Sequence, residues 1–240
     1  MIFSYSRLLL YETCPRRFYF RYILKLVEKV SKPLALGKAV HKAIEKIIEG
    51  MSVEDSVLEG FTECDFHPEV SYDEITRLVK NAPVFKNMGE TEVHFCLPLS
   101  NDENAPKIQG YIDLVTDSGA FTDWKTNWKP YGHANRQLGL YAWALSKMKG
   151  IDLVEGSLYF LRFKKEYKYF FSQVEIEESR QWALNLANEI NFKLDLLDMM
   201  PEKVDEIFSP TFSSACQHCP FVLECHLKNI GKGEDLNNVV

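Results

Sequence analysis

The first third of the chain carries its hydrophobic residues at helical spacing. Ser6 is the expected N-cap of an opening helix, and Pro15 is expected to begin a second helical segment that runs through Arg21. Isoleucine and valine at helical spacing predict a further helix from about Gly37 to Ile48. Residues 52–88 predict two more helices, separated near His67-Pro68.

Beyond residue 88 the pattern changes from helical to alternating, which is typical of strands. We expect strands near 90–99, 107–116 and 120–126, a helix from about 131 to 149, strands at 153–163 and 167–175, and a long helix over about 178–199. The chain from Ser209 onward is expected to be irregular. This pattern predicts an α/β fold, in which a mixed sheet is flanked by helices and preceded by a helical N-terminal region.

The turn Asp117-Ser118-Gly119-Ala120 is expected to fold the second and third strands into a hairpin. Asp123 and Lys125 are two residues apart, so they point to the same face of a strand. Opposed residues share a face, so Asp113 joins them only if the loop has an odd number of residues. A three-residue loop over 118–120 would set Asp113 opposite Lys125.

These three side chains suit one kind of chemistry. Two converging carboxylates form a hard oxygen site for Mg²⁺ or Mn²⁺, which activates water and polarises a phosphoryl oxygen. A lysine beside them stabilises developing negative charge. The spacing of Asp113, Asp123 and Lys125 therefore suggests a metal-dependent nuclease. The alternative is an exposed hairpin with ordinary charges, because an acid-x-lysine pair alone is common.

Composition and charge neither support nor exclude the interpretation as a metal-dependent nuclease. The 240 residues are 46% apolar and 26% charged, as in soluble globular proteins. The net charge of −6 is uneven, because the basic residues gather in 1–50 and 121–170. Such segments are compatible with DNA binding or with solvated helix faces. No apolar run suits a membrane span and no signal peptide is evident, so a cytoplasmic location is expected.

The cysteines form a second signal. Cys216, Cys219 and Cys225 lie within ten residues, a spacing typical of a metal or cluster site in a protein without structural disulfides. Cys14 is the candidate fourth ligand. Zinc and a [4Fe–4S] cluster both accept four thiolates, and His218 or His226 as a ligand would favour zinc. Cys64 and Cys96 are expected to be ordinary small apolar residues. In either case the expected role is structural, a clasp between the two ends of the chain.

With these pieces together, the sequence resembles the PD-(D/E)XK nuclease superfamily. Within it, the match is to the RecB-like branch that carries an iron–sulfur cluster, which includes the AddB nuclease domain and the four-cysteine nuclease of CRISPR adaptation. The resemblance runs nearly end to end. Its motifs are Ser4-Tyr5-Ser6-Arg7-Leu8 with Cys14-Pro15-Arg16-Arg17, Gly37-Lys38-Ala39-Val40-His41, Gly110-Tyr111-Ile112-Asp113, Asp123-Trp124-Lys125-Thr126, Gln137-Leu138-Gly139-Leu140-Tyr141 and the three C-terminal cysteines.

The resemblance implies a role for each motif. Metal ligands would be His41, Glu92, Asp113 and Asp123, although Glu92 has Glu90 two residues away on the same expected face. Lys125, Gln137 and Tyr141 would complete the catalytic set with the two aspartates. Gln137 and Tyr141 lie four apart on one helix face, so they would orient the lysine or contact DNA, or else form an ordinary surface pair. The cluster ligands would be Cys14, Cys216, Cys219 and Cys225.

The resemblance also implies an organisation and a function. We expect a single restriction-endonuclease-like domain over 1–240, with a helical region over 1–88, a catalytic core over 89–200 and a cluster-binding segment over 201–240. The expected activity is that of a Mg²⁺- or Mn²⁺-dependent DNA exonuclease on single-stranded or frayed ends. It would act in CRISPR prespacer processing, with the integrase complex, or in DNA repair and recombination with a helicase–nuclease partner. The alternatives are a non-catalytic iron–sulfur scaffold that binds DNA and a zinc protein with an unrelated catalytic role.

Overall fold

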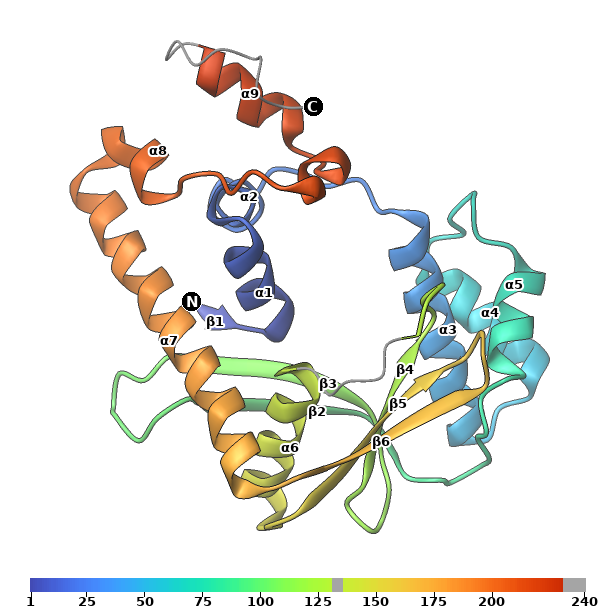
Figure 1. Ribbon diagram of the computed structural model, residues 1–240. Coiled ribbons are helices and arrows are strands. Elements are labelled where there is room, and N and C mark those ends of the chain that lie inside the picture. Colours follow the sequence, from blue (N-terminus) through green and yellow to red (C-terminus); the bar gives the residue numbers. More distant parts are fainter. Residues whose placement is uncertain (131–135, 231–240) are drawn as a thin grey trace. The chain divides into compact units, whose positions relative to one another are not determined.

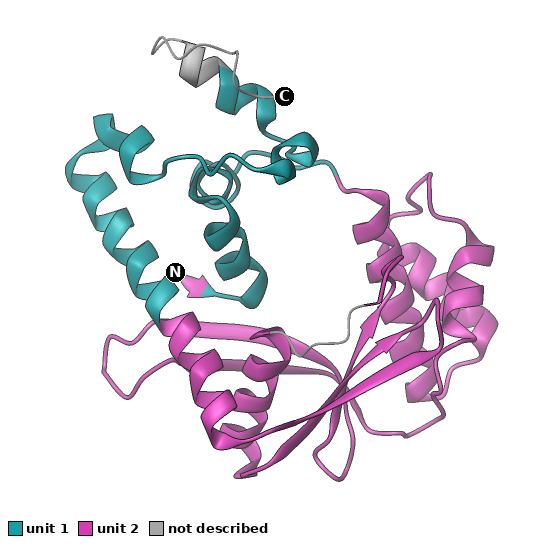
Figure 2. Ribbon diagram, viewed as in Figure 1, with its two compact units in different colours: residues 1, 3–29, 185–240 teal, residues 2, 30–184 magenta. Residues whose placement is uncertain are grey.

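The computed structural model describes residues 1–130 and 136–230, the last four of them without side chains. The chain divides into two compact units, which are coloured separately in Figure 2. One unit contains Ile2 and Val30–Leu184 and is called here the sheet unit. The other contains Met1, Phe3–Lys29 and the chain from Asn185 onward, and is called the cysteine unit because it holds the four cysteines of the predicted cluster site.

The sheet unit is built on a mixed sheet of six strands (Figure 1). Its order is β1-β3-β4-β5-β6, and β2 also pairs with β3. The pair β4–β5 is parallel, whereas β2–β3, β3–β4 and β5–β6 are antiparallel. The predicted mixed sheet flanked by helices is confirmed. The strands are β1 (Ile2–Phe3), β2 (Glu90–Pro98), β3 (Lys107–Val115), β4 (Phe121–Lys125), β5 (Val154–Phe160) and β6 (Lys165–Phe171).

The register of the β3–β4 hairpin differs from the predicted one. The loop has an odd number of residues, but it spans 117–119, because Leu114 pairs with Thr122 and the Thr116 amide donates to the Ala120 carbonyl at 2.8 Å. Gly119 takes the left-handed conformation (φ +84°) that this turn needs and that glycine adopts without strain. Continued along the strands, this register sets Asp113 level with Asp123 rather than with Lys125.

Three helices stand together beside the strands of the sheet unit (Figure 1). They are α3 (Lys32–Glu49), α4 (Val53–Glu63) and α5 (Tyr72–Val79), and they bury one apolar cluster with Leu114 and Trp124 of the sheet. Gly60 of α4 approaches the backbone carbonyl of Ala39 so closely that a Cβ would collide with it. The two helices predicted within 52–88 are confirmed.

Two helix starts fall earlier than predicted. Helix α3 begins at Lys32 rather than Gly37, because Ser31 is the N-cap and Pro33 occupies the first turn, where its missing N–H costs nothing. Helix α7 (Gln173–Met199) begins at 173 rather than 178. There Ser172 and Glu175 form a capping box, in which the Ser172 amide donates to Glu175 Oε2 at 2.9 Å. Helix α6 (Arg136–Lys149) includes most of the predicted 131–149, and residues 131–135 lie outside the described part.

The cysteine unit contains short helices at both chain ends. Its opening helix is capped by Ser4, not Ser6, since the Ser4 hydroxyl accepts from the Arg7 amide at 3.3 Å. The segment from Ser209 onward, predicted to be irregular, forms two further helical elements. The unit's elements are α1 (Tyr5–Thr13), α2 (Pro15–Phe18), the π-helix η1 (Tyr19–Ile23), the later part of α7, η2 (Pro201–Lys203), α8 (Val204–Ile207), η3 (Ser214–His218) and α9 (Val222–Ile230).

The core of the cysteine unit is aromatic. Phe208 stacks on Phe18 and Tyr19, with ring centroids 6.4 and 5.4 Å away. Arg16 is only 3% exposed, and it donates to the Phe208 carbonyl at 2.8 Å and pairs with Asp205 at 2.5 Å. A buried guanidinium needs such partners to offset its lost hydration, so Arg16 ties α2 to α8.

Among the described residues, no helix is both long and apolar enough to span a bilayer.

Candidate functional site

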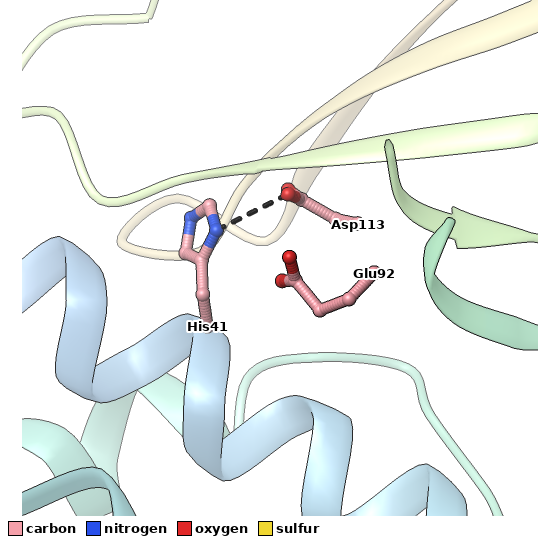
Figure 3. A group of neighbouring side chains, drawn as sticks. All are labelled: His41, Glu92 and Asp113. Carbon is pink, nitrogen blue, oxygen red and sulfur yellow. Dashed lines mark ion pairs between the residues drawn. The ribbon is translucent and has the colours of Figure 1, made fainter. Parts of the chain in front are cut away.

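Three potential metal ligands converge in the sheet unit: His41 from α3, Glu92 from β2 and Asp113 from β3 (Figure 3). Each offers one ligand atom, and these atoms all lie within 4.8 Å of one another. It is the one such group of histidine, cysteine and acidic residues within the described ranges. One nitrogen and two carboxylates suit a divalent cation such as Mg²⁺ or Mn²⁺.

The backbone of Trp124 positions two of these ligands. Its amide donates to Asp113 Oδ2 at 2.8 Å, and its carbonyl lies 2.9 Å from His41 Nε2. A carbonyl only accepts, so Nε2 carries a proton, and the other ring nitrogen, Nδ1, lies 3.3 Å from Asp113 Oδ1. Nδ1 is therefore the nitrogen that a cation would bind. The Trp124 side chain is buried in the cluster with α3, which fixes its backbone against the helix that carries His41.

Glu92 reaches the group through an unusual backbone conformation. Thr91 pairs with Leu114 and Val93 with Ile112, which leaves Glu92 level with Asp113 between the two pairs. Glu92 has φ +49°, in the left-handed region that a residue with a Cβ rarely adopts within a strand. Strain of this kind costs on the order of 1–3 kcal/mol and concentrates at functional sites. Here it accompanies a carboxylate that is directed toward His41 and Asp113 (Figure 3).

Asp123 lies beside this group and is paired with the lysine. It is 2% exposed, and its Oδ2 lies 2.5 Å from Lys125 Nζ. The lysine also donates to Gln137 Oε1 at 3.1 Å, and Gln137 Nε2 donates to the Tyr141 hydroxyl at 3.0 Å. Asp123, Lys125, Gln137 and Tyr141 thus form one chain of polar contacts between β4 and α6. Tyr141 is buried, so the pair with Gln137 is more than a helix-surface contact.

Gly110 leaves room for the ring of Phe95, against which the Tyr141 ring packs. A Cβ at Gly110 would stand 2.7 Å from the Phe95 ring and 3.4 Å from that of Tyr141. The Tyr141 ring packs edge-on against Phe95 and Phe121, with centroids 6.1 and 6.0 Å away. The glycine of the Gly110-Tyr111-Ile112-Asp113 motif is therefore required by packing below the site.

The pKa values of the site residues are shifted because buried acids lie close together. Burial opposes the charged form of His41, yet the neighbouring Asp113 outweighs it and raises the pKa of His41 to about 9. Burial raises the pKa of Asp123 to about 6 against the opposing effect of Lys125, with Asp113 adding to the rise. Burial and Asp113 also raise the pKa of Glu92. A bound cation would replace the proton on His41 Nδ1 and relieve the repulsion between the carboxylates, and perturbed pKa values of this kind are frequent at functional sites.

His41, Glu92 and Asp113 line a cavity of about 560 Å³ that also reaches residues outside the predicted set. Lys38 and Lys42 of α3 line one side, and Tyr111 of β3 lines it next to Asp113. Sequence reasoning missed the two lysines as site residues, although Lys38 lies three positions before His41 and so one helical turn away. It could not find Trp124, because the contribution of this residue is made by its main chain.

The four predicted cluster ligands line a single cavity within the cysteine unit. Its volume is about 450 Å³, and Arg16, Arg17 and His226 also line it. Burial raises the pKa of Cys219 and Cys225, and the neighbouring thiols act in the same direction. Cys64 is buried and Cys96 is exposed, and neither lines this cavity. The structure thus brings together Cys14, Cys216, Cys219 and Cys225.

Comparison with known proteins places the chain in a family. Residues 2–226 match the model of the PD-(D/E)XK nuclease superfamily. The chain belongs to that superfamily, whose members cut nucleic acids and generally use divalent metal ions.

A solved structure of low sequence identity shares the fold. A candidate exonuclease from Eubacterium rectale superposes with a TM-score of 0.53 at 11% identity, covering 100% of this chain and 90% of its own. A protein designated SSO0001 gives a TM-score of 0.36 at 13% identity, over 88% and 94% of the two chains. No curated protein sequence matches the chain.

Proposed function

We propose that the protein is a metal-dependent deoxyribonuclease, an exonuclease that hydrolyses phosphodiester bonds at single-stranded or frayed DNA ends. The observation that carries the proposal is the convergence of His41, Glu92 and Asp113 beside the Asp123–Lys125 pair. A module that only binds DNA has no need of such a group. Membership of a nuclease superfamily agrees with this chemistry.

The cation would be held by His41 Nδ1 and by carboxylate oxygens of Glu92 and Asp113, with Asp123 adjoining. Its donor set of oxygen and imidazole nitrogen suits Mn²⁺ or Mg²⁺ better than a soft metal. When bound, such an ion polarises a phosphoryl oxygen and lowers the pKa of water. The Trp124 carbonyl keeps the proton of His41 on Nε2, so that Nδ1 is available as a ligand.

The remaining residues act on charge and orientation. Lys125 Nζ lies against Asp123 and is held by Gln137, so the ammonium is fixed beside the place where the phosphate would lie. There it would stabilise the negative charge that develops during hydrolysis. Gln137 and Tyr141 are positioning residues in this proposal, because they act through the lysine.

At the four cysteines we propose a structural [4Fe–4S] cluster rather than zinc. A tetrahedral zinc site with Zn–S bonds of about 2.3 Å needs sulfurs about 3.8 Å apart. No three of the described cysteine sulfurs all lie within 4.8 Å of one another, and a cavity of about 450 Å³ is present between them. A cluster fits this spacing better, because each thiolate binds a different iron. Arg16 and Arg17 line the cavity and would offset the negative charge of such a cluster.

We propose two alternative biological settings, and both rest on the sequence resemblance. One setting is the trimming of prespacers in CRISPR adaptation, which is antiviral defence, alongside the integrase complex. The other is DNA repair or recombination, where a helicase–nuclease complex would supply the DNA end. Both require removal of unpaired DNA, so the proposed activity is the same in each.

The test is degradation of single-stranded DNA labelled at either end. Anaerobically purified protein is incubated with Mn²⁺, with Mg²⁺ or with chelator, and is compared with the Asp113→Asn and Asp123→Asn variants. The control is Asp117→Asn, which removes an exposed acid from the nearby turn. We expect metal-dependent shortening that both site variants lose and the control keeps. Equal cleavage by Asp113→Asn would overturn the proposal, and DNA binding without cleavage would favour the scaffold.

A further inference from the structure

An exposed tyrosine lies directly beside the proposed metal ligands. Tyr111 is 54% exposed and precedes Asp113 by two residues on β3, so both side chains leave the strand on the same side. The residues that alternate with it point the other way, as shown by Ile112, which is fully buried. Tyr111 therefore adds little to the hydrophobic core, although it is a large aromatic residue at the centre of a strand.

The ring of Tyr111 is supported from the neighbouring strand. His94 is its partner in the β2–β3 register, and the two rings lie 4.7 Å apart with an interplanar angle of 36°. Cross-strand aromatic pairs also occur on exposed sheet faces for stability alone. That explanation accounts for the pair but not for its place, because Tyr111 lines the same cavity as His41, Glu92 and Asp113.

A cation lines the same cavity from α3. Lys38 is exposed, and it makes no ion pair with any residue in the described part of the chain. Lys42, one turn further on, is instead held by Glu45 at 2.9 Å. Glu45 and Glu63 line the cavity as well, and they would repel a phosphate backbone. The part of the cavity that suits an anion is therefore the part nearest Lys38.

We propose that Tyr111, supported by His94, is a stacking platform for a nucleobase, and that Lys38 contacts a phosphate of the same strand. The proposal rests on the proposed nuclease function and names the residues that would hold the unpaired DNA end. An aromatic platform beside a backbone-binding cation is how proteins hold single strands without reading sequence. In a duplex each base is covered by its neighbours and its partner, so only an unpaired base offers a free face to Tyr111.

The first experiment compares Tyr111→Ala, Tyr111→Leu and Tyr111→Phe in the full cluster-loaded chain. Steady-state cleavage of a single-stranded oligonucleotide is measured with Mn²⁺, and folding is checked by melting temperature. Loss of the ring is expected to raise KM about 5- to 150-fold, the effect typical of one lost stacking contact. Leucine keeps bulk but not a π-face, so it should resemble alanine, and phenylalanine should restore binding. Phe170→Ala, which removes another exposed aromatic residue, is the control.

A second readout reports stacking itself. An oligonucleotide with 2-aminopurine near its end is expected to show a fluorescence change on binding to wild type and Tyr111→Phe, but not to Tyr111→Leu. Lys38→Ala is expected to raise KM and to flatten its salt dependence, because a phosphate contact releases counterions. Lys38→Arg should keep the salt dependence.

The two proposals fail in different ways. If wild-type protein cleaves DNA in the presence of metal but Tyr111→Leu matches it in KM and in 2-aminopurine signal, the stacking platform is overturned and the nuclease stands. If wild-type protein cleaves no DNA with either metal, the nuclease fails, and the platform fails with it.

Discussion

His41 donates a hydrogen bond of 2.9 Å to the carbonyl oxygen of Trp124, the residue between Asp123 and Lys125. The amide of the same residue binds Asp113 at 2.8 Å. The peptide units around Trp124 thus hold two ligands from two other elements, while its neighbours supply the third carboxylate and the lysine. The acid-x-lysine motif positions the site with its main chain as well as with its side chains.

Replacement of Lys125 by methionine is expected to lower kcat by about 10²- to 10³-fold, the usual effect of removing one group that stabilises developing charge. Mn²⁺ affinity should be retained, because Lys125 pairs with Asp123 and does not belong to the group of converging ligands. Cleavage kinetics and a metal titration measure the two effects separately. Lys129→Met, an exposed change just beyond the same strand, is the control. An unchanged kcat in Lys125→Met would remove the lysine from the proposed mechanism.

Replacement of Cys216 by serine is expected to remove most of the bound iron and the visible absorption, and to lower the melting temperature. The physical reason is that three thiolates hold a cluster weakly. Without the cluster, the segments that line this cavity are no longer tied together. Iron, zinc and sulfide analysis of anaerobically purified protein provides the measurement. Cys96→Ser is the matched control, since Cys96 is exposed on β2. Stoichiometric zinc in wild-type protein would contradict the cluster.

Replacement of Gly60 by alanine is expected to destabilise the protein by about 1–3 kcal/mol, because the added Cβ would meet the backbone carbonyl of Ala39. Because this contact is with a backbone atom, the collision can be relieved only if helices α3 and α4 move apart. Gly37→Ala is the control for stability, because its Cβ would meet no atom closer than 3.9 Å. Chemical denaturation compares the two variants. Equal unfolding free energies would show that α3 and α4 are less closely packed.

Replacement of Glu74 by glutamine tests a partly buried ionic contact of the sheet unit. Glu74 binds Arg162 at 3.0 Å and Lys32 at 3.1 Å. Burial opposes its charge, but these two cations outweigh burial and hold the pKa of Glu74 below its usual 4.5. The stabilisation is therefore fully present above pH 4.5 and is lost as the pH falls through the folded-state pKa. We expect Glu74→Gln to cost about 1–3 kcal/mol at pH 7.

The pH dependence distinguishes this contact from a loss of packing. The difference in unfolding free energy between wild type and Glu74→Gln should shrink as the solution is acidified below pH 4.5. A difference that is constant with pH would mean that the charge of Glu74 contributes nothing. Glu177→Gln, which affects an exposed pair with Arg180, provides a comparison expected to stay near zero at pH 7.

The sheet could be predicted because apolar and polar residues alternate along its strands. Local sequence patterns did not fix the bounds and register of every element. Asp117-Ser118-Gly119-Ala120 is compatible with a loop over 117–119 or over 118–120, and the structure selects the one in which Gly119 has a positive φ. The early start of α7 had a readable signal, the capping box Ser172–Glu175. In contrast, the left-handed backbone of Glu92 depends on tertiary contacts that no local pattern carries.

The same distinction applies to the candidate site. His41, Glu92 and Asp113 were expected as metal ligands and converge in the structure. The resemblance grouped Asp123 with them as an equal, whereas the structure pairs it with Lys125 at 2.5 Å. Lys38 and Tyr111 belong to the two motifs that contain His41 and Asp113. That they line one cavity is known only from the structure, which brings α3 and β3 together.

A titration of the full, cluster-loaded chain with Mn²⁺, followed by electron paramagnetic resonance in the absence of DNA, examines the metal centre itself. Wild-type protein and the Asp117→Asn control should bind the ion, and Asp113→Asn and His41→Ala should bind it about tenfold or more weakly. Unchanged Mn²⁺ affinity in both Asp113→Asn and His41→Ala would contradict a metal centre at His41, Glu92 and Asp113, and with it the proposed mechanism of DNA cleavage.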